Sequence, residues 1–174
     1  MESAILSHRG GNTDRNKRII VYNTKSMIDL VKQLRDETGV SIGKCKEALD
    51  QANNDIERAR EILREFSAAA AAKKADRELG AGTIGSYLHT NKQNASIVEL
   101  LCETDFVGRN EDFIQLAQHL AMHVAAMSST SETLRSEPFL MDPEKTIQQI
   151  IEGATQKLGE RIDIGRVVFV KIGE

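Results

Sequence analysis

Near Gly80 the spacing of the apolar residues along the chain changes from a helical to an extended pattern. Between residues 27 and 66 they fall on one face of an α-helix, whereas after Gly82 they gather in short runs, such as Ile97-Val98, that favour strands. Helices followed by strands predict an α+β fold. We expect an N-terminal three-helix module, followed by a small three-stranded antiparallel sheet packed with helices.

Capping residues divide the N-terminal part into three short helices. Thr24 or Ser26 begins the first helix and Gly39 ends it, while Ser41 begins the second. Asn54 opens a capping-box pattern, so we expect it to begin the third helix. Three helices of this size are marginal for independent folding, and we therefore expect them to pack on a neighbour or a partner.

The rest of the chain predicts the sheet and its helices. Two apolar runs around the polar turn at residues 90–94 predict a hairpin, and residues 166–172 predict the third strand. Asn110 begins a long helix, and Asp142-Pro143 begins another over residues 144–158. We expect both helices on one face of the sheet.

These elements divide the chain into four parts. Residues 1–23 are basic and are expected to form a disordered leader, with a cloning remnant and an organellar transit peptide as the alternatives. Residues 24–66 form the three-helix domain, residues 67–81 a helical linker, and residues 82–174 the α+β core domain.

Composition argues against two broad classes of partner. No apolar run approaches the roughly 18–20 residues of a membrane-spanning helix. The net charge is −3, and basic residues are concentrated near the N-terminus, which leaves an acidic body. Because nucleic-acid backbones attract positive surfaces, we expect neither a nucleic acid nor a membrane as partner.

No pattern in the sequence supports a metal, a cofactor or covalent catalysis. The glycines of Gly80–Gly85 match a dinucleotide-binding motif, but they follow a helix and precede a strand, so we expect a helix stop and a closely packed strand start. His119 and His123 have metal-ligand spacing without further ligands, and we expect both to be partly exposed. Cys45 and Cys102 fall on apolar faces and are expected to be free, buried thiols.

The segment Thr104–Arg109 is harder to explain as structure alone. It connects the second strand to the long helix, and Phe106 lies in it between an aspartate and the following Val-Gly-Arg. Phe106 either folds back onto the core or faces solvent as the anchor of a protein interface. The residues by themselves favour neither alternative.

Four stretches carry a resemblance, in this order: VKQLRDETGVSIGKCKEAL (31–49), AAKKADRE (71–78), GTIGSYLH (82–89) and VELLCETDFVGRNEDF (98–113). Together they resemble translation elongation factor Ts, in a short form. That family promotes guanine-nucleotide exchange on the GTPase elongation factor Tu. The resemblance implies a module similar to ubiquitin-associated domains that docks on the GTPase, and an exchange factor without bond chemistry or a cofactor.

The resemblance also implies which residues contact the GTPase. Asp105 and Phe106 would insert between its helices, beside its magnesium and phosphate site, with Thr104 and Val107 shaping the connector. A first docking surface would comprise Gly39, Val40, Ser41 and Ile42.

The chain also departs from the family. Longer members carry a second core lobe and an inserted helical hairpin after the long helix, where this chain has only residues 128–137 before the next segment. The second contact surface is therefore either missing or supplied by a homodimer that forms through the exposed sheet edge. Position 108 is glycine where alanine is common in the family, which would loosen the connector.

One alternative belongs to another functional class. A non-catalytic adaptor would use the three-helix module to bind ubiquitin or another small protein, but it would not need the strand–connector–helix unit of residues 98–113. The expected compartment is the cytoplasm, or a mitochondrion or plastid if residues 1–23 are a transit peptide.

Overall fold

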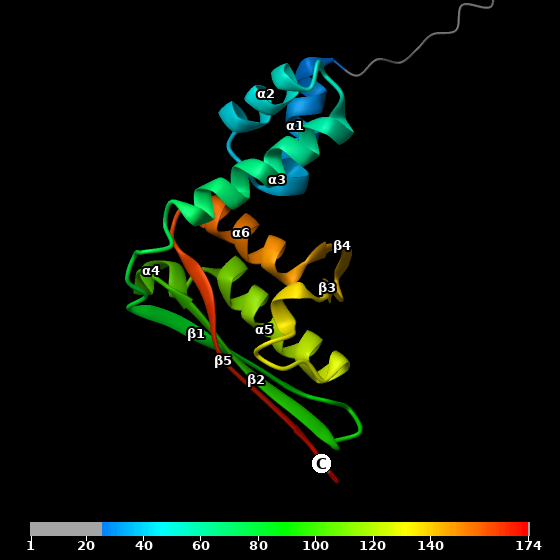
Figure 1. Ribbon diagram of the computed structural model, residues 1–174, viewed down its shortest axis with the longest axis vertical. Helices are drawn as coiled ribbons and strands as arrows, with labels where there is room; N and C mark the ends of the chain where they lie inside the picture. The colour runs from blue at the N-terminus through cyan, green and yellow to red at the C-terminus, as the bar shows by residue number, and fades with distance from the viewer. Residues whose placement is uncertain (1–25, 174) are drawn as a thin grey trace, which may run out of the picture.

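The described chain has two parts: a helical head at residues 26–72 and an α+β body at residues 81–173. A computed structural model describes residues 26–173, so the expected leader at residues 1–23 lies outside the described residues. Figure 1 shows the head stacked on the body, with the sheet at the end of the molecule away from the head.

Three helices form the head: α1 (Met27–Thr38), α2 (Ile42–Gln51) and α3 (Ile56–Ala72). Ser26 caps α1 in a capping box, because its side chain accepts a hydrogen bond from the Asp29 N–H and the Asp29 carboxylate accepts one from the Ser26 N–H. Gly39, with φ 67°, ends the helix in the left-handed conformation. The buried side chains come from all three helices and include Leu34, Cys45, Ala48, Leu49, Ala59, Ile62 and Leu63.

Asp55 begins α3, so the prediction of Asn54 as its cap was wrong. The Asp55 carboxylate accepts hydrogen bonds from the N–H groups of Glu57 and Arg58, at 2.9 and 3.1 Å. Asn54 has φ 63° and belongs to the turn that follows α2. A residue in this left-handed conformation lacks the extended backbone of an N-cap, which moves the cap to the next residue.

The segment predicted as a helical linker is helical only at its start. α3 continues to Ala72, and turns follow it. Ser67 is buried; its hydroxyl donates to the Leu63 carbonyl oxygen at 2.9 Å and also contacts the amide oxygen of Gln156 in α6. The last turns of α3 therefore pack against the body.

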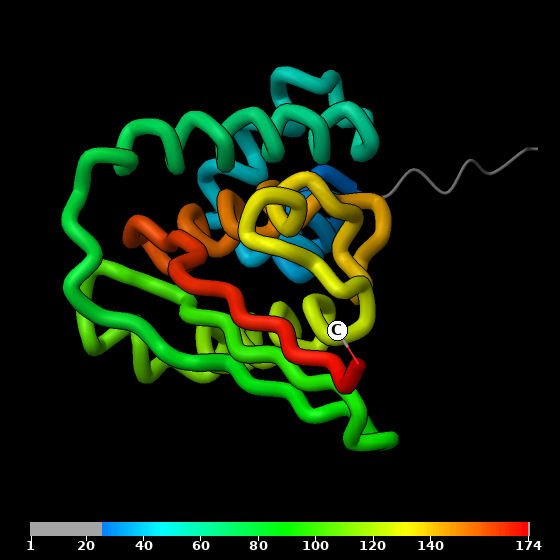
Figure 2. Tube along the Cα trace, turned by 60° about the horizontal axis from the view of Figure 1, so that its bottom comes forward, coloured from blue at the N-terminus to red at the C-terminus, as the bar shows by residue number. Residues whose placement is uncertain are grey.

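The sheet comprises three strands: β1 (Ala81–Leu88), β2 (Asn94–Cys102) and β5 (Ile162–Lys171). β2 lies in the centre and pairs antiparallel with both neighbours, and Figure 2 shows the three strands side by side. β5 begins at Ile162 rather than at residue 166, and an irregularity between Val98 and Leu100 shifts its register with β2. The predicted α+β class with a three-stranded antiparallel sheet is confirmed.

Helices α5 (Glu111–Met127) and α6 (Ile147–Leu158) belong to the body. Asn110 caps α5 as expected, accepting a hydrogen bond from the Asp112 N–H at 2.9 Å. α5 packs on the inner face of β1 and β2, while α6 lies between α3 and the rest of the body (Figure 1). The core that they enclose includes Val98, Leu100, Phe113, Leu120, Val124, Ile147 and Ile151.

Asp142-Pro143 does not begin a helix, which corrects the prediction. It lies in strand β4 (Asp142–Thr146), which pairs with the short strand β3 (Pro138–Phe139). α6 begins after Thr146, whose side chain accepts from the Gln149 N–H while the Gln149 side chain accepts from the Thr146 N–H. This complete capping box fixes the start of the helix beyond the proline.

His123 is fully buried, at 0% exposure, whereas the sequence predicted partial exposure. The segment after α5 folds back over the helix, so that His123 Nε2 lies 2.9 Å from the Glu137 carboxylate. The other ring nitrogen, Nδ1, accepts a hydrogen bond from the Leu140 N–H at 3.2 Å. His119, one turn earlier, is half-buried. The burial of His123 comes from long-range contacts that helix periodicity does not indicate.

Candidate partner-binding site

The segment that follows β2 forms a single helical turn, α4 (Asp105–Gly108), before α5 begins. Thr104 caps this turn. Its carbonyl oxygen accepts from the Gly108 N–H at 3.1 Å, and its side-chain oxygen accepts from the Val107 N–H at 3.4 Å. Because one isolated helical turn is unstable in water, the position of α4 depends on contacts with the rest of the protein.

One side of α4 faces the core and the other faces solvent. Val107 is 5% exposed and belongs to the core of the body. Gly108 is also buried, and a Cβ at this position would lie 3.3 Å from the Gly82 carbonyl oxygen. Phe106, in contrast, is 83% exposed. It therefore faces solvent rather than the core, as an aromatic anchor of a protein interface does.

Asp105 lies beside Phe106 on the exposed side of α4. Its carboxylate is 3.0 Å from the guanidinium of Arg109, one turn further along, and both side chains are largely exposed. Ion pairs in this setting contribute little to stability, so a partner can displace this one at small cost.

Thr104 also contacts a residue far away in the sequence. The carboxylate of Glu160, which follows α6, accepts hydrogen bonds from the Thr104 N–H at 3.0 Å and from the Thr104 hydroxyl at 2.6 Å. The sequence did not indicate Glu160 as a site residue, because no motif links it to Thr104.

A second carboxylate holds the strand end that precedes α4. Glu103 accepts a hydrogen bond from the Arg161 backbone N–H, and the Arg77 guanidinium lies 3.1 Å from it. These hydrogen bonds outweigh desolvation and lower the pKa of Glu103. The Arg161 guanidinium in turn donates to the Arg77 carbonyl oxygen at 2.6 Å. The segment after α3 is thus tied to the base of the α4 turn.

The two cysteines are free and buried, as predicted. The Cys102 thiol donates to the Thr104 carbonyl oxygen at 3.1 Å, directly beneath α4. Burial raises the pKa of both thiols, and the nearby Glu160 carboxylate raises that of Cys102 further. Since the thiolate is the nucleophilic form, this environment does not activate either cysteine.

Residues 26–173 contain neither a metal-binding cluster nor a helix that could cross a membrane. No group of three or more His, Cys, Asp or Glu side chains is arranged to hold a metal ion. Within the same range, no helix has both the length and the apolar character needed to cross a membrane.

The residues predicted as a first docking surface lie where α1 meets α2. Ile42 is 53% exposed, and Ser41 is exposed and caps α2. Val40 is buried in the core of the head, and a Cβ at Gly39 would lie 2.9 Å from the Lys157 side chain of α6. Gly39, Ser41 and Ile42 are therefore exposed and offer surface, whereas Val40 is buried and holds the loop to the core of the head. This set lies on the head, apart from α4 on the body.

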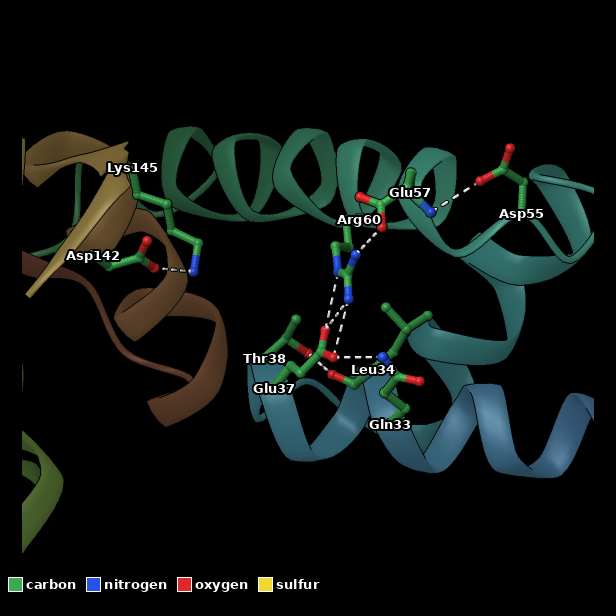
Figure 3. Close-up of polar contacts among 9 residues, drawn as sticks. All are labelled: Gln33, Leu34, Glu37, Thr38, Asp55, Glu57, Arg60, Asp142 and Lys145. Atoms are coloured by element: carbon green, nitrogen blue, oxygen red, sulfur yellow. Dashed lines mark hydrogen bonds and ion pairs between the residues drawn. The ribbon is translucent and has the colours of Figure 1, made fainter. Parts of the chain in front are cut away.

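A groove of about 790 Å³ lies between the head and α6, lined by residues of α1 and α3 on one side and of β4 and α6 on the other. Figure 3 shows Arg60 of α3 between Glu37 of α1, at 3.0 Å, and Glu57 of its own helix. Lys145 pairs with Asp142 at 2.6 Å in β4. The groove carries charges of both signs, which does not indicate one class of ligand.

Comparison with known proteins points to one family. The model of a family described as "Elongation factor TS" matches residues 103–174, a range that includes α4. A relative from Thermosipho melanesiensis named elongation factor Ts is 38% identical over 191 residues, which covers 83% of this chain and 97% of the relative. The chain belongs to the elongation factor Ts family.

Other members of the elongation factor Ts family are longer than this chain. A relative of that name from Clostridium botulinum strain Eklund 17B is 45% identical over 139 residues, which covers 79% of this chain but only 45% of the relative. One from strain ATCC 19397 is 40% identical over 144 residues and is covered to 47%. The chain thus spans about half the length of these relatives and nearly all of the Thermosipho protein.

Proposed function

We propose that this chain is a guanine-nucleotide exchange factor that binds elongation factor Tu in its GDP form and promotes release of the nucleotide. Asp105 and Phe106 would enter the GTPase beside its magnesium and phosphate site. The observation that carries the proposal is the 83% exposure of Phe106 on a turn that Val107 anchors in the core. A large apolar side chain held out in this way is suited to insertion into a partner.

Thermodynamic linkage explains how such insertion releases GDP. A factor that binds the nucleotide-free GTPase better than its GDP form must weaken GDP binding by the same ratio. Burial of a phenylalanine side chain contributes about 1.5–3 kcal/mol, which becomes available only in the complex. Displacement of the magnesium ion would remove the charge that bridges phosphate to protein carboxylates. No covalent bond changes, so we do not propose an enzyme of bond chemistry.

The head would supply a separate docking surface. Ile42 and Ser41 are exposed at the junction of α1 and α2, and Gly39 and Val40 fix the shape of that loop. An adaptor that binds a small protein through its head alone would make no use of Phe106. Loss of exchange on substitution of Phe106 therefore discriminates between the two functions.

The experiment is release of labelled GDP from elongation factor Tu, measured with the wild-type chain and with the Phe106→Ala and Asp105→Ala variants. We expect both variants to slow release, Phe106→Ala by about 10-fold or more because of the lost apolar burial. Both positions are exposed, so circular dichroism should show an unchanged fold. Wild-type activity in both variants would rule out the proposed mechanism.

A second copy of the chain is the further partner that we propose. Residues Gly85, Val98 and Val167 pair across the sheet and face the core, so their neighbours along the strands face outward. We call this the outer sheet face; its exposed apolar side chains are Ile84, Leu88, Ile97, Val168 and Val170. Large contiguous apolar patches are uncommon on monomers, and the same patch on two copies can pair about a two-fold axis. Such a homodimer would form in the cytoplasm, the compartment that we propose.

A further inference from the structure

Glu160 holds the first residue of the α4 turn at two points. The residue follows Gly159, which ends α6 with φ 80°, so that the chain reverses and brings the carboxylate to Thr104. One carboxylate oxygen accepts from the Thr104 N–H at 3.0 Å and the other accepts from the Thr104 hydroxyl at 2.6 Å. Hydrogen bonds to an ionised acceptor are stronger than those between neutral groups.

These two bonds determine how Thr104 caps the turn. The Thr104 hydroxyl has one hydrogen to donate, and it donates to the Glu160 carboxylate. The lone pairs of the hydroxyl oxygen are therefore left to accept from the Val107 N–H at 3.4 Å. Thr104 thus receives its orientation from Glu160 and passes it to α4. Val107, buried in the core, holds the other end of the turn.

We propose that Glu160 is a positioning residue of the exchange reaction, one that fixes the direction in which α4 presents Asp105 and Phe106. This inference rests on the proposed exchange function. A four-residue helix does not hold its own orientation. Val107 anchors its buried end and the Cys102 thiol contacts the Thr104 carbonyl oxygen, but neither contact orients the Thr104 hydroxyl that caps the turn. The Glu160 carboxylate fixes that hydroxyl before the partner arrives, which lowers the entropy cost of binding.

The test compares Glu160→Ala and Glu160→Gln with the wild-type chain in two measurements. Glu160→Ala removes both acceptors, while Glu160→Gln replaces one acceptor oxygen with an amide nitrogen that cannot accept from the Thr104 N–H or hydroxyl. Glu144→Ala is the matched control, because Glu144 is an exposed glutamate on β4. Phe106→Ala, alone and combined with Glu160→Ala, completes the set.

The first measurement is hydrogen exchange of the backbone amides, which needs no partner. We expect Glu160→Ala to increase exchange at Val107 and Gly108 by about tenfold, in line with the loss of one to two hydrogen bonds, and to leave α5 unchanged. Glu160→Gln should fall between Glu160→Ala and the wild type. Unchanged exchange in α4 would overturn the proposal, as would an equal increase throughout the body, which indicates general destabilisation.

The second measurement is release of labelled GDP from elongation factor Tu at increasing concentrations of each variant. We expect Glu160→Ala to raise the half-saturating concentration by about tenfold in the wild-type background. It should add less when Phe106 is already alanine, because part of its effect acts through that side chain and only the part that acts through Asp105 is left. Full additivity of the two substitutions would contradict the positioning role even if both slow exchange.

The two proposals fail in different ways. If the wild-type chain does not speed GDP release, the exchange function falls; if Phe106→Ala and Asp105→Ala are both as active as the wild type, the insertion mechanism falls, and the positioning role falls with it. If Phe106→Ala is slow and Glu160→Ala is as fast as the wild type, only the inference about Glu160 is overturned.

Discussion

Gly85 has no Cβ atom, and this allows β1 to lie close to α5. At Gly85 a Cβ would lie 2.0 Å from the Ala117 carbonyl oxygen, far closer than such atoms approach one another in proteins. At Gly153, in the middle of α6, a Cβ would meet no atom within 4 Å apart from its chain neighbours and the backbone of its own helix. Two glycines in the same body are thus under opposite constraints: one is required by packing and the other only weakens its helix.

We therefore predict opposite effects for the same substitution at these two residues. Gly85→Ala should lower the free energy of unfolding by about 2–3 kcal/mol, because α5 has to move away from the sheet. Gly153→Ala should raise it by up to about 1 kcal/mol, because alanine favours helix over glycine. Urea unfolding of both variants checks this pair. A Gly85→Ala variant as stable as the wild type would show that the sheet and α5 do not pack as described.

At the scale of elements, His123 joins α5 to the segment that leads into the β3–β4 ribbon. Its ring bridges the Glu137 carboxylate and the Leu140 N–H, which lie on either side of β3. Hydrogen bonds from the Ser129 and His123 side chains, among others, outweigh desolvation and lower the pKa of Glu137. The fully buried ring and the ionised carboxylate therefore act as one internal clamp.

Removal of this clamp should cost far more than removal of the neighbouring histidine. His123→Ala leaves a cavity, takes the partner from the Leu140 N–H and removes one of the hydrogen bonds to Glu137, so we predict a loss of about 2–4 kcal/mol in the free energy of unfolding. His119→Ala, on the same helix but half-buried, should change it by less than about 1 kcal/mol. Thermal or urea unfolding measures both. Equal losses of unfolding free energy in the two variants would mean that the contacts of His123 with Glu137 and Leu140 do not stabilise the protein.

Helix starts show where local patterns mislead. Asp142-Pro143 is a favourable helix start in isolation, yet the complete capping box of Thr146 and Gln149 places the start of α6 further along. Asn54 lost its expected role in the same way, because the turn after α2 holds it at φ 63° and Asp55 caps α3 instead. Both regions contain competing caps, and the backbone of the adjoining turn or strand decided between them.

At the scale of the whole molecule, residues 26–173 cover the sheet on one side only. α5 packs on the inner face, while the outer sheet face exposes its apolar side chains to solvent. Near the middle of that face, the Arg166 guanidinium lies 2.6 Å from Glu99 and lowers the pKa of this carboxyl to about 2. The pair is internally neutral above that pH, so it places no net charge on a surface that we propose to be self-associating.

We predict that a charge on the outer sheet face prevents self-association. Ile97→Lys, at a residue that is 46% exposed, should shift the chain from dimer to monomer in sedimentation velocity, because the lysine charge would have to be buried. Ile114→Lys is the control, since Ile114 is 41% exposed on α5 and away from this face. A wild-type chain that remains monomeric at high micromolar concentration would exclude the homodimer.

The sequence pattern was sufficient to predict the features that depend on residues close together along the chain. The helical and extended periods predicted the α+β class, Asn110 predicted one helix start, and Ser26 was one of two candidates for another. The short connector drew attention to Phe106. The exposure of Phe106, the burial of His123 and the contact between Glu160 and Thr104 were decided only by tertiary structure. Each depends on segments that are distant in sequence and meet only when the body folds. Periodicity describes one element at a time, and so it cannot indicate which distant carboxylate or backbone N–H completes a site.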